Sequence, residues 1–139
     1  MIIVDASVAN KLFLTHESGY KQVKTIFRKH VNDTEKILVP DLLFYEIANT
    51  LATKLMVPSV KIGLALNQLD KYDLEIFRSS LKDIFKIAVF AKEFHVSVYD
   101  ATYAVLAKEK GCELITADEK FVKQVNLSFV KSLQDYSDV

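Results

Sequence analysis

Four carboxylates in this 139-residue sequence occupy positions from which a metal-dependent reaction could be carried out: Asp5, Glu46, Asp100 and Asp118. Asp5 and Asp118 each follow a short apolar segment, and Glu46 lies in an otherwise uncharged apolar stretch. Several carboxylates within a few ångströms of one another cannot all stay ionised without a compensating cation. Oxygen ligands without a neighbouring His or Cys suit Mg²⁺ or Mn²⁺ better than zinc. If these acids meet in space, they predict a magnesium or manganese site.

A divalent cation held by carboxylates can activate a water molecule and hold a phosphodiester for in-line attack. Ser7, Asn49 and Thr116 lie close to these acids in the sequence and could fix the carboxylates by hydrogen bonds. The motifs of two other kinds of active site, a serine hydrolase and a glycine-rich nucleotide-binding loop, are missing from the sequence. The sequence has no nucleophile elbow, and its three glycines lie too far apart to form a phosphate-binding loop.

The elements that must position these acids alternate between strand and helix. Short apolar runs predict strands over residues 2–4, 37–39, 74–77, 113–116 and 127–130. Helical spacing and capping signals predict helices over residues 6–14, 19–31, 42–55, 59–71, 81–94, 99–110 and 118–125. Alternation without hairpin signals indicates right-handed crossovers and a parallel sheet. We therefore predict one α/β domain over residues 1–139, a three-layer α/β/α sandwich.

A parallel sheet brings the acids to one edge. Asp5 and Asp118 must both emerge at the carboxyl ends of their strands, where open α/β sheets bind ligands. The helix over 99–110 leads into a following parallel strand and therefore runs antiparallel to the strands. Its first turn, which contains Asp100, is expected near the same edge.

Each acid also has a structural interpretation. Asp5 and Asp118 can cap the helices that follow them, and Asp100 can form a capping box with Ser97. Glu46 can lie on the polar face of an amphipathic helix. Capping does not require several carboxylates to meet, so their distance in space distinguishes the two interpretations.

Local signals predict several details of the elements. Pro40 is expected to stop the second strand, and Asp41 to cap the next helix. The polar tail after Ser132 is expected to fray. Apolar residues at helical spacing predict the core face of the helix over 81–94. They are Leu81, Ile84, Phe85, Ala88, Ala91 and Phe94.

Composition excludes several protein classes. The chain carries 18 basic and 18 acidic residues, so its zero net charge argues against a strongly basic nucleic-acid binder. Its single cysteine excludes an internal disulfide scaffold. It shows neither a signal peptide nor the run of about 20 apolar residues that spans a bilayer. We therefore expect a soluble, cytoplasmic protein.

At these residues the sequence resembles the PIN-domain proteins of the VapC toxin type. The matching segments are IIVDAS (2–7), VPDLLFYEIANTL (39–51), VSVYDATYAVLAKEKG (96–111) and CELITADEKF (112–121). The short motifs DAS or TAD alone would be a weak signal. All four in this order are fairly specific, and with the intervening helices they cover essentially the whole chain.

The resemblance implies both structure and function. It implies a five-stranded parallel sheet of order 3-2-1-4-5 and an endoribonuclease that depends on Mg²⁺ or Mn²⁺. It also implies an RNA substrate, a VapB-like antitoxin as partner in a type II toxin–antitoxin pair, and a homodimer. The acids implied to be catalytic and to bind one or two metal ions are Asp5, Glu46, Asp100 and Asp118. The residues implied to line the same pocket are Ser7, Asn49 and Thr116.

Two other functions fit a sheet of this kind. Thr116 and Lys131 loosely match the threonine and lysine of a phospho-receiver, a binding module on a flavodoxin-like sheet. Against it, Phe77 and Arg78 follow the third strand, where the phospho-acceptor aspartate would lie. The other possibility is a catalytically idle PIN scaffold that keeps the pocket only for a partner.

Overall fold

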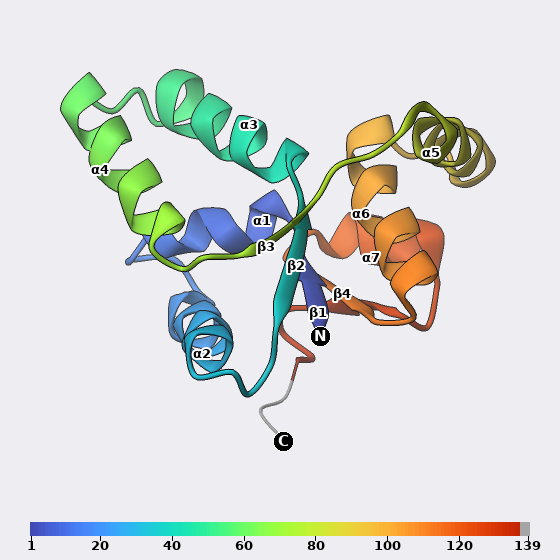
Figure 1. The fold of residues 1–139 in the computed structure, drawn as a ribbon, viewed down its shortest axis with the longest axis horizontal. Coiled ribbons are helices and arrows are strands. Elements are labelled where there is room, and N and C mark those ends of the chain that lie inside the picture. Colours follow the sequence, from blue (N-terminus) through green and yellow to red (C-terminus); the bar gives the residue numbers. More distant parts are fainter. Residues whose placement is uncertain (137–139) are drawn as a thin grey trace.

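The computed structural model describes residues 1–136, which contain a five-stranded parallel sheet with helices on both faces (Figure 1). The strand order is β3-β2-β1-β4-β5, which confirms the predicted fold and sheet order. The strands are β1 (Ile2–Val4), β2 (Ile37–Pro40), β3 (Glu75–Phe77), β4 (Glu113–Thr116) and β5 (Val130–Ser132).

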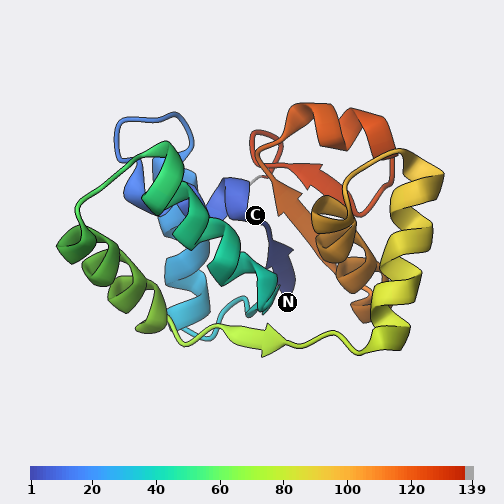
Figure 2. The same cartoon turned by 90° about the horizontal axis from the view of Figure 1, so that it is seen from above.

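Two groups of helices cover the sheet, and Figure 2 shows them on opposite sides of it. The first group is α1 (Ala6–Ala9), the 3₁₀ turn η1 (Asn10–Phe13), α2 (Tyr20–Val31), α3 (Leu42–Asn49), the π-helical turn η2 (Thr50–Lys54) and α4 (Ser59–Asp70). The second group is α5 (Leu81–Phe94), α6 (Val98–Lys110) and α7 (Glu119–Val125). From β1 the chain adds β2 and β3 on one side of the sheet, and then crosses back to add β4 and β5 on the other side. Because both series of crossovers are right-handed, the two groups of helices lie on opposite faces. Within residues 1–136, none of these helices is long and apolar enough to cross a bilayer.

Strand β1 is the centre of the core. Ile2, Ile3 and Val4 are at most 4% exposed, and the strand pairs with β2 on one side and β4 on the other. Because helices cover both faces, the strand is apolar at every position rather than alternating. This burial fixes the direction in which Asp5 leaves the sheet.

The predicted fifth strand was wrong in position. Residues 127–130 mostly form the turn after α7, and β5 occupies Val130–Ser132. Asn126 ends α7 in the left-handed conformation with φ 48°, and the Val130 amide donates to the Leu127 carbonyl. This turn uses residues that the apolar pattern alone had assigned to the strand.

The tail also differs from the prediction in part. Leu133 is 3% exposed, and its amide donates to the Thr116 carbonyl, so the chain stays packed after Ser132. Residues 137–139, to which the fraying prediction also applied, lie outside the described part of the chain.

Two predicted boundaries around β2 also need correction. Pro40 is the last residue of β2, in register with Phe77, rather than a residue beyond the strand. Asp41 precedes α3, but its side chain makes no capping hydrogen bond. The helix predicted over 42–55 is α-helical only as far as Asn49 and continues as the π-helical turn η2.

The predicted core face of α5 is divided between two environments. Ala91 packs inward beside Ile87 and Phe90. Leu81, Ile84, Phe85 and Ala88 are exposed instead, with Leu81 and Phe85 at 84% and 70%, so the predicted core face is wrong at these four positions. The apolar period was correct, but α5 has apolar residues on both of its sides, and only one side can face the sheet.

Candidate active site

Asp5 lies at the end of β1 and is buried, with 7% of its surface exposed. Its Oδ1 accepts hydrogen bonds from the Ser7 hydroxyl at 2.5 Å and from the Val8 amide at 3.1 Å. Asp5 therefore does cap α1, as the structural interpretation predicted. Both of these bonds reach the same oxygen, so capping engages only one side of the carboxylate.

A hydrogen-bond network joins the ends of β1 and β4. The Asp5 amide donates to the Ile115 carbonyl at 3.4 Å. The Ser7 hydroxyl accepts from the Ala117 amide at 2.9 Å and lies 3.3 Å from the Thr116 hydroxyl. Ser7 is therefore the residue that connects the two strand ends around Asp5.

Asp118 lies on the β4 side of this network. Its amide donates to the Thr116 hydroxyl at 3.1 Å, and its Oδ1 accepts from the Phe121 amide at 3.0 Å. Asp118 caps α7, while Thr116 is fully buried at the end of β4. Ser7 and Thr116 thus hold the backbone beside two of the predicted acids.

Glu46 comes from α3 and meets α6 through a tyrosine that the sequence analysis missed. The Tyr103 hydroxyl donates to Glu46 Oε1 at 3.3 Å, and Tyr103 is 1% exposed. A usable signal was present: Tyr103 follows Asp100 by three positions, so both lie on one side of α6, and a buried tyrosine hydroxyl requires a partner. Tyr103 links the helix that carries Glu46 to the helix that carries Asp100.

Asp100 lies in the first turn of α6, where its amide donates to the Ser97 hydroxyl at 3.0 Å. Burial raises the pKa of the Asp100 carboxyl, a hydrogen bond with Ser97 lowers it, and the charge of Asp118 raises it further. Asp100 is therefore within electrostatic reach of the end of β4.

The central carboxyl groups have raised pKa values. Burial raises the pKa of Asp5 to about 6, against the opposing hydrogen bonds from Ser7, Thr116 and the Val8 amide, and the charge of Asp100 adds to the rise. Burial likewise raises the pKa of Glu46 to about 7. The hydrogen bond from Tyr103 lowers it, and the charges of Asp5 and Asp100 raise it. The four acids thus form one connected set in which each is repelled by at least one other.

Asn49, which was predicted to line the pocket, makes no hydrogen bond to these acids among those found in the described part of the chain. It is exposed on α3, and its Oδ1 accepts from the Thr53 hydroxyl, one turn further along, at 3.4 Å. The π-helical turn η2 begins directly after it. The polar stripe of α3 therefore divides into Glu46, which faces α6, and Asn49, which faces solvent.

The acids do not form a closed cage. Among residues 1–136, no three His, Cys, Asp or Glu side chains lie close enough to surround a metal ion. An open set of carboxylates still fits Mg²⁺ or Mn²⁺, because Mg²⁺ usually keeps several waters and binds through one or two carboxylates. A cation would also counteract the burial and the mutual repulsion that raise these pKa values. The donor chemistry therefore fits a hard divalent ion rather than zinc.

Comparison with known proteins agrees with this geometry. The family model described as PIN domain matches residues 2–126. Ribonuclease VapC3 of Pyrobaculum aerophilum is 26% identical over 130 residues, which span 88% of this chain and 93% of that protein.

Two crystal structures share the fold. PAE2754 from Pyrobaculum aerophilum has 21% identity and a TM-score of 0.70, over 96% of this chain and 89% of that one. VapC20 of Mycobacterium tuberculosis, a toxin that cleaves the sarcin–ricin loop, has 14% identity and a TM-score of 0.67, over 94% and 97% of the two chains. The resemblance to VapC-type proteins is confirmed, and the chain belongs to the PIN-domain family.

Proposed function

We propose that this protein is an endoribonuclease that depends on Mg²⁺ or Mn²⁺ and acts as the toxin of a type II toxin–antitoxin pair. The observation that carries the proposal is Asp5, a buried acid at the carboxyl edge of the sheet whose pKa is raised to about 6. Structural caps are usually solvated, and their pKa values are lowered by the bonds that they accept. The names of the relatives, a ribonuclease and an RNA-cleaving toxin, support the same assignment.

The proposed metal ligands and catalytic acids are Asp5, Glu46, Asp100 and Asp118. A divalent ion bound there would supply an activated water and charge to offset the phosphate. The protein holds Asp5 through the Ser7 hydroxyl and the Val8 amide, and it holds Glu46 through Tyr103. These bonds orient the carboxylates before the substrate arrives, which limits the reorganisation that the reaction requires.

Cleavage of RNA with and without Mn²⁺ tests the proposal, using wild type, Asp5→Asn and Asp70→Asn. Asp5→Asn keeps an oxygen to cap α1 but removes the charge, so cleavage should be lost while the thermal unfolding transition remains. Asp70 is exposed at the end of α4 and serves as the matched control, with unchanged cleavage. Equal cleavage by Asp5→Asn and wild type would refute the mechanism.

A separate measurement distinguishes the enzyme from an idle PIN scaffold. The scaffold interpretation predicts no Mn²⁺ binding at the acids, whereas the nuclease predicts binding that Asp5→Asn weakens. The phospho-receiver interpretation is not retained, because the chain belongs to the PIN-domain family and Phe77 ends β3 where an acceptor aspartate is required.

The antitoxin belongs to the same proposal and has a candidate surface. Val60 and Leu64 are 76% and 64% exposed on α4, one turn apart. Beside Leu64, a cavity of about 280 Å³ is lined by residues of η1, η2, α4 and the connection between η2 and α4, including Leu12, Leu51 and Leu55. An apolar segment of an antitoxin would bury this surface.

Inhibition by the VapB-like antitoxin that the family resemblance implies would test this surface. That protein should stop cleavage at one equivalent, and Leu64→Lys should weaken inhibition about tenfold or more without changing cleavage itself. Unchanged inhibition of Leu64→Lys would place the antitoxin elsewhere. A homodimer, which the family resemblance implies, is also part of the proposal.

A further inference from the structure

The exposed side of α2 carries a concentration of positive charge. Lys21, Lys24 and Arg28 are exposed on this side of the helix, and residues 20–31 contain no Asp or Glu. Among residues 1–136, none of the three makes an ion pair. Because the chain as a whole has zero net charge, these three residues form a local excess of positive charge, which we call the basic face of α2.

The acids nearest to α2 in the sequence are paired with other cations. Glu17, which precedes the helix, pairs with Lys11 at 3.2 Å. After the helix, Asp33 pairs with Lys36, and Glu35 pairs with the amino group of the N-terminus. These acids already have partners, so the basic face of α2 remains available to an anion from outside the chain.

A groove runs along this basic face. Its cavity measures about 470 Å³, and the described residues that line it are Lys21, Lys24, Thr25, Arg28, Val31 and Tyr72, none of which is acidic. The Tyr72 ring packs edge-on against Phe27, with 4.9 Å between the ring centroids, and this contact holds the ring in place as one wall. The groove therefore combines cationic side chains with an aromatic surface.

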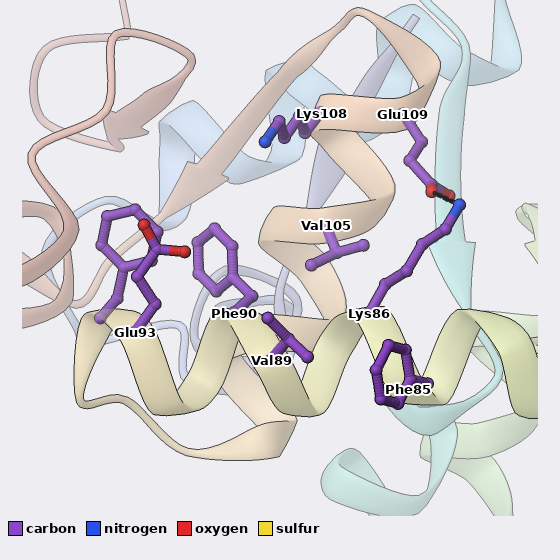
Figure 3. A pocket seen from close by; sticks show the side chains of 9 residues that line it. Phe85, Lys86, Val89, Phe90, Glu93, Val105, Lys108 and Glu109 are labelled. Carbon is purple, nitrogen blue, oxygen red and sulfur yellow. Dashed lines mark hydrogen bonds and ion pairs between the residues drawn. The ribbon is translucent and has the colours of Figure 1, made fainter.

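The groove between α5 and α6 has a cavity of the same volume, but its charges are offset. Figure 3 shows Lys86 of that groove paired with Glu109, at 2.5 Å, and Glu93 further along the same lining. Phe90 and Val105 make much of the lining apolar. A polyanion would meet carboxylates there, so of these two grooves only the one on α2 suits it.

The basic face begins at the same edge of the sheet as the candidate active site. Gln22, in the first turn of α2, donates from its side chain to the Leu133 carbonyl at 3.4 Å. The Leu133 amide donates to the Thr116 carbonyl at 2.7 Å, and Thr116 belongs to the network around Asp5. Because α2 leads into the parallel strand β2, it runs from this edge toward the opposite one. A polymer bound at the acids can therefore continue along α2.

We propose that the basic face of α2 is a second binding site for RNA, which contacts the phosphates of a substrate segment outside the active site. Such contacts supply affinity and position the RNA without reading its sequence. Lys21 and Arg28 lie about 10 Å apart along the helix axis, a length that matches roughly three phosphates of a stacked strand. Tyr72 supplies an aromatic surface for an unpaired base. That the ligand is the substrate rests on the proposed function.

The lining of the groove favours RNA over an anionic membrane. A helix that lies on a membrane combines basic residues with large apolar side chains that enter the lipid. In α2, all of whose residues are described, Val31 at the last position is the one large apolar side chain that is exposed. The basic face thus suits a polymer of phosphates better than a lipid surface.

RNA binding in EDTA tests the site without catalysis. The probe is fluorescein-labelled polyuridylate of about 30 nucleotides, followed by fluorescence anisotropy at several salt concentrations. Combining Lys21→Gln, Lys24→Gln and Arg28→Gln should raise the Kd at least about tenfold. It should also reduce the slope of log Kd against log salt by about 2, since three phosphate contacts are lost. Gln forms helices about as well as Lys and Arg, so the circular dichroism spectrum should not change.

A matched variant controls for the change in net charge. Combining Lys82→Gln, Lys92→Gln and Lys123→Gln removes the same charge from exposed positions on α5 and α7. This variant should keep the slope of the wild type. Equal slopes and affinities in the two triple variants would overturn the site on α2. Tighter binding of wild type to phosphatidylserine vesicles than to polyuridylate would overturn RNA as its ligand.

Cleavage kinetics separate this inference from the proposed function. In the Mn²⁺ assay, the α2 triple variant should raise the KM for RNA about tenfold and leave kcat unchanged, because the acids are intact. A wild type that binds polyuridylate through α2 but cleaves no RNA would refute the proposed nuclease and leave the α2 site standing. A wild type that cleaves RNA, with an α2 variant of unchanged KM, would refute the α2 site alone.

Discussion

Two regions of the molecule break the usual rule that charged side chains are exposed and apolar ones are buried. One is the carboxyl edge of β1 and β4, and the other is the outer side of α5. At the sheet edge, Asp5 is a charged group enclosed by the core. On α5, Leu81 and Phe85 are apolar side chains exposed to solvent. Each arrangement is unfavourable for an isolated chain and becomes favourable when something binds. The site gathers negative charge, so it suits a cation, whereas the helix exposes apolar side chains, so it suits a protein surface.

The two regions also differ in how their residues are supported. Asp5, Ser7 and Thr116 belong to a network of hydrogen bonds that holds each group in place before binding. The exposed apolar side chains of α5 have no such network and depend on shape and area. Substitutions at the sheet edge should therefore change RNA cleavage and the pKa values of the acids. Substitutions on the outer side of α5 should change the binding of a partner.

The largest expected effect is at the sheet edge. Asp5→Asn should reduce RNA cleavage by about 10³-fold or more, because it removes charge that would hold the proposed divalent ion. The same variant should unfold at a higher temperature than wild type in EDTA at pH 8, since it removes a buried, uncompensated charge. A variant that lost activity and also unfolded at a lower temperature would instead assign Asp5 a purely structural role.

The two sides of α5 provide the next contrast. Ile87→Ala removes a side chain that is 3% exposed and should lower the free energy of unfolding by about 3 kcal/mol. Leu81→Ala, at 84% exposure, should change the stability of the monomer by less than about 0.5 kcal/mol. Urea unfolding, measured at concentrations low enough to keep the chain monomeric, checks both. Similar losses in the two variants would mean that Leu81 is packed within the single chain.

The pH dependence of stability should distinguish the buried acids from ordinary ones. The folded-state pKa of Asp5 is raised from 3.8 to about 6 and that of Glu46 from 4.5 to about 7. Each charge therefore destabilises the fold above its folded-state pKa, and this cost disappears as pH falls through the window from about 7 to 4.

Urea unfolding in EDTA at pH 8 and pH 5 checks this prediction. The advantage of Asp5→Asn over wild type should be on the order of 2 kcal/mol at pH 8 and smaller at pH 5. Saturating Mn²⁺ should also reduce the advantage at pH 8, because the ion stabilises the ionised wild type. An advantage that does not vary with pH would contradict the raised pKa of Asp5.

The smallest effect is expected at Tyr103. Tyr103→Phe keeps the ring in the core but removes the hydrogen bond to Glu46, which should cost about 1 kcal/mol of stability. Because that bond favours the ionised carboxylate, its loss should raise the pKa of Glu46 further and weaken Mn²⁺ binding at pH 7 about tenfold. Calorimetric titration with Mn²⁺ measures the effect. Thr102→Val, a half-buried position next to Tyr103 whose hydroxyl bonds within α6, is the control.

Much of the fold could be predicted because its signals are local. The apolar run of β1, the Ser80 cap of α5 and Gly111 after α6 each specify their own surroundings. The misplaced fifth strand shows the limit of such signals. Leu127 and Val130 are both apolar, and only pairing with β4 selects Val130 for the strand.

The candidate site shows the same limit. Asp5, Glu46, Asp100 and Asp118 could be selected from the sequence by their position at strand and helix ends, together with the family resemblance. Tyr103 was missed because an apolar helical pattern does not show where a hydroxyl points. Asn49 lies one turn beyond Glu46, yet its side chain bonds to Thr53 rather than facing the acids.

The sequence by itself determined the alternation of strands and helices, the edge at which Asp5 and Asp118 emerge, and the spacing of apolar residues on α5. These depend on residues close together in the chain, through capping, periodicity and the direction of parallel strands. Only the tertiary structure decided that Tyr103 meets Glu46 and that Leu81 and Phe85 face outward. Periodicity shows that a helix has an apolar side, but which side is buried depends on the surfaces packed around it.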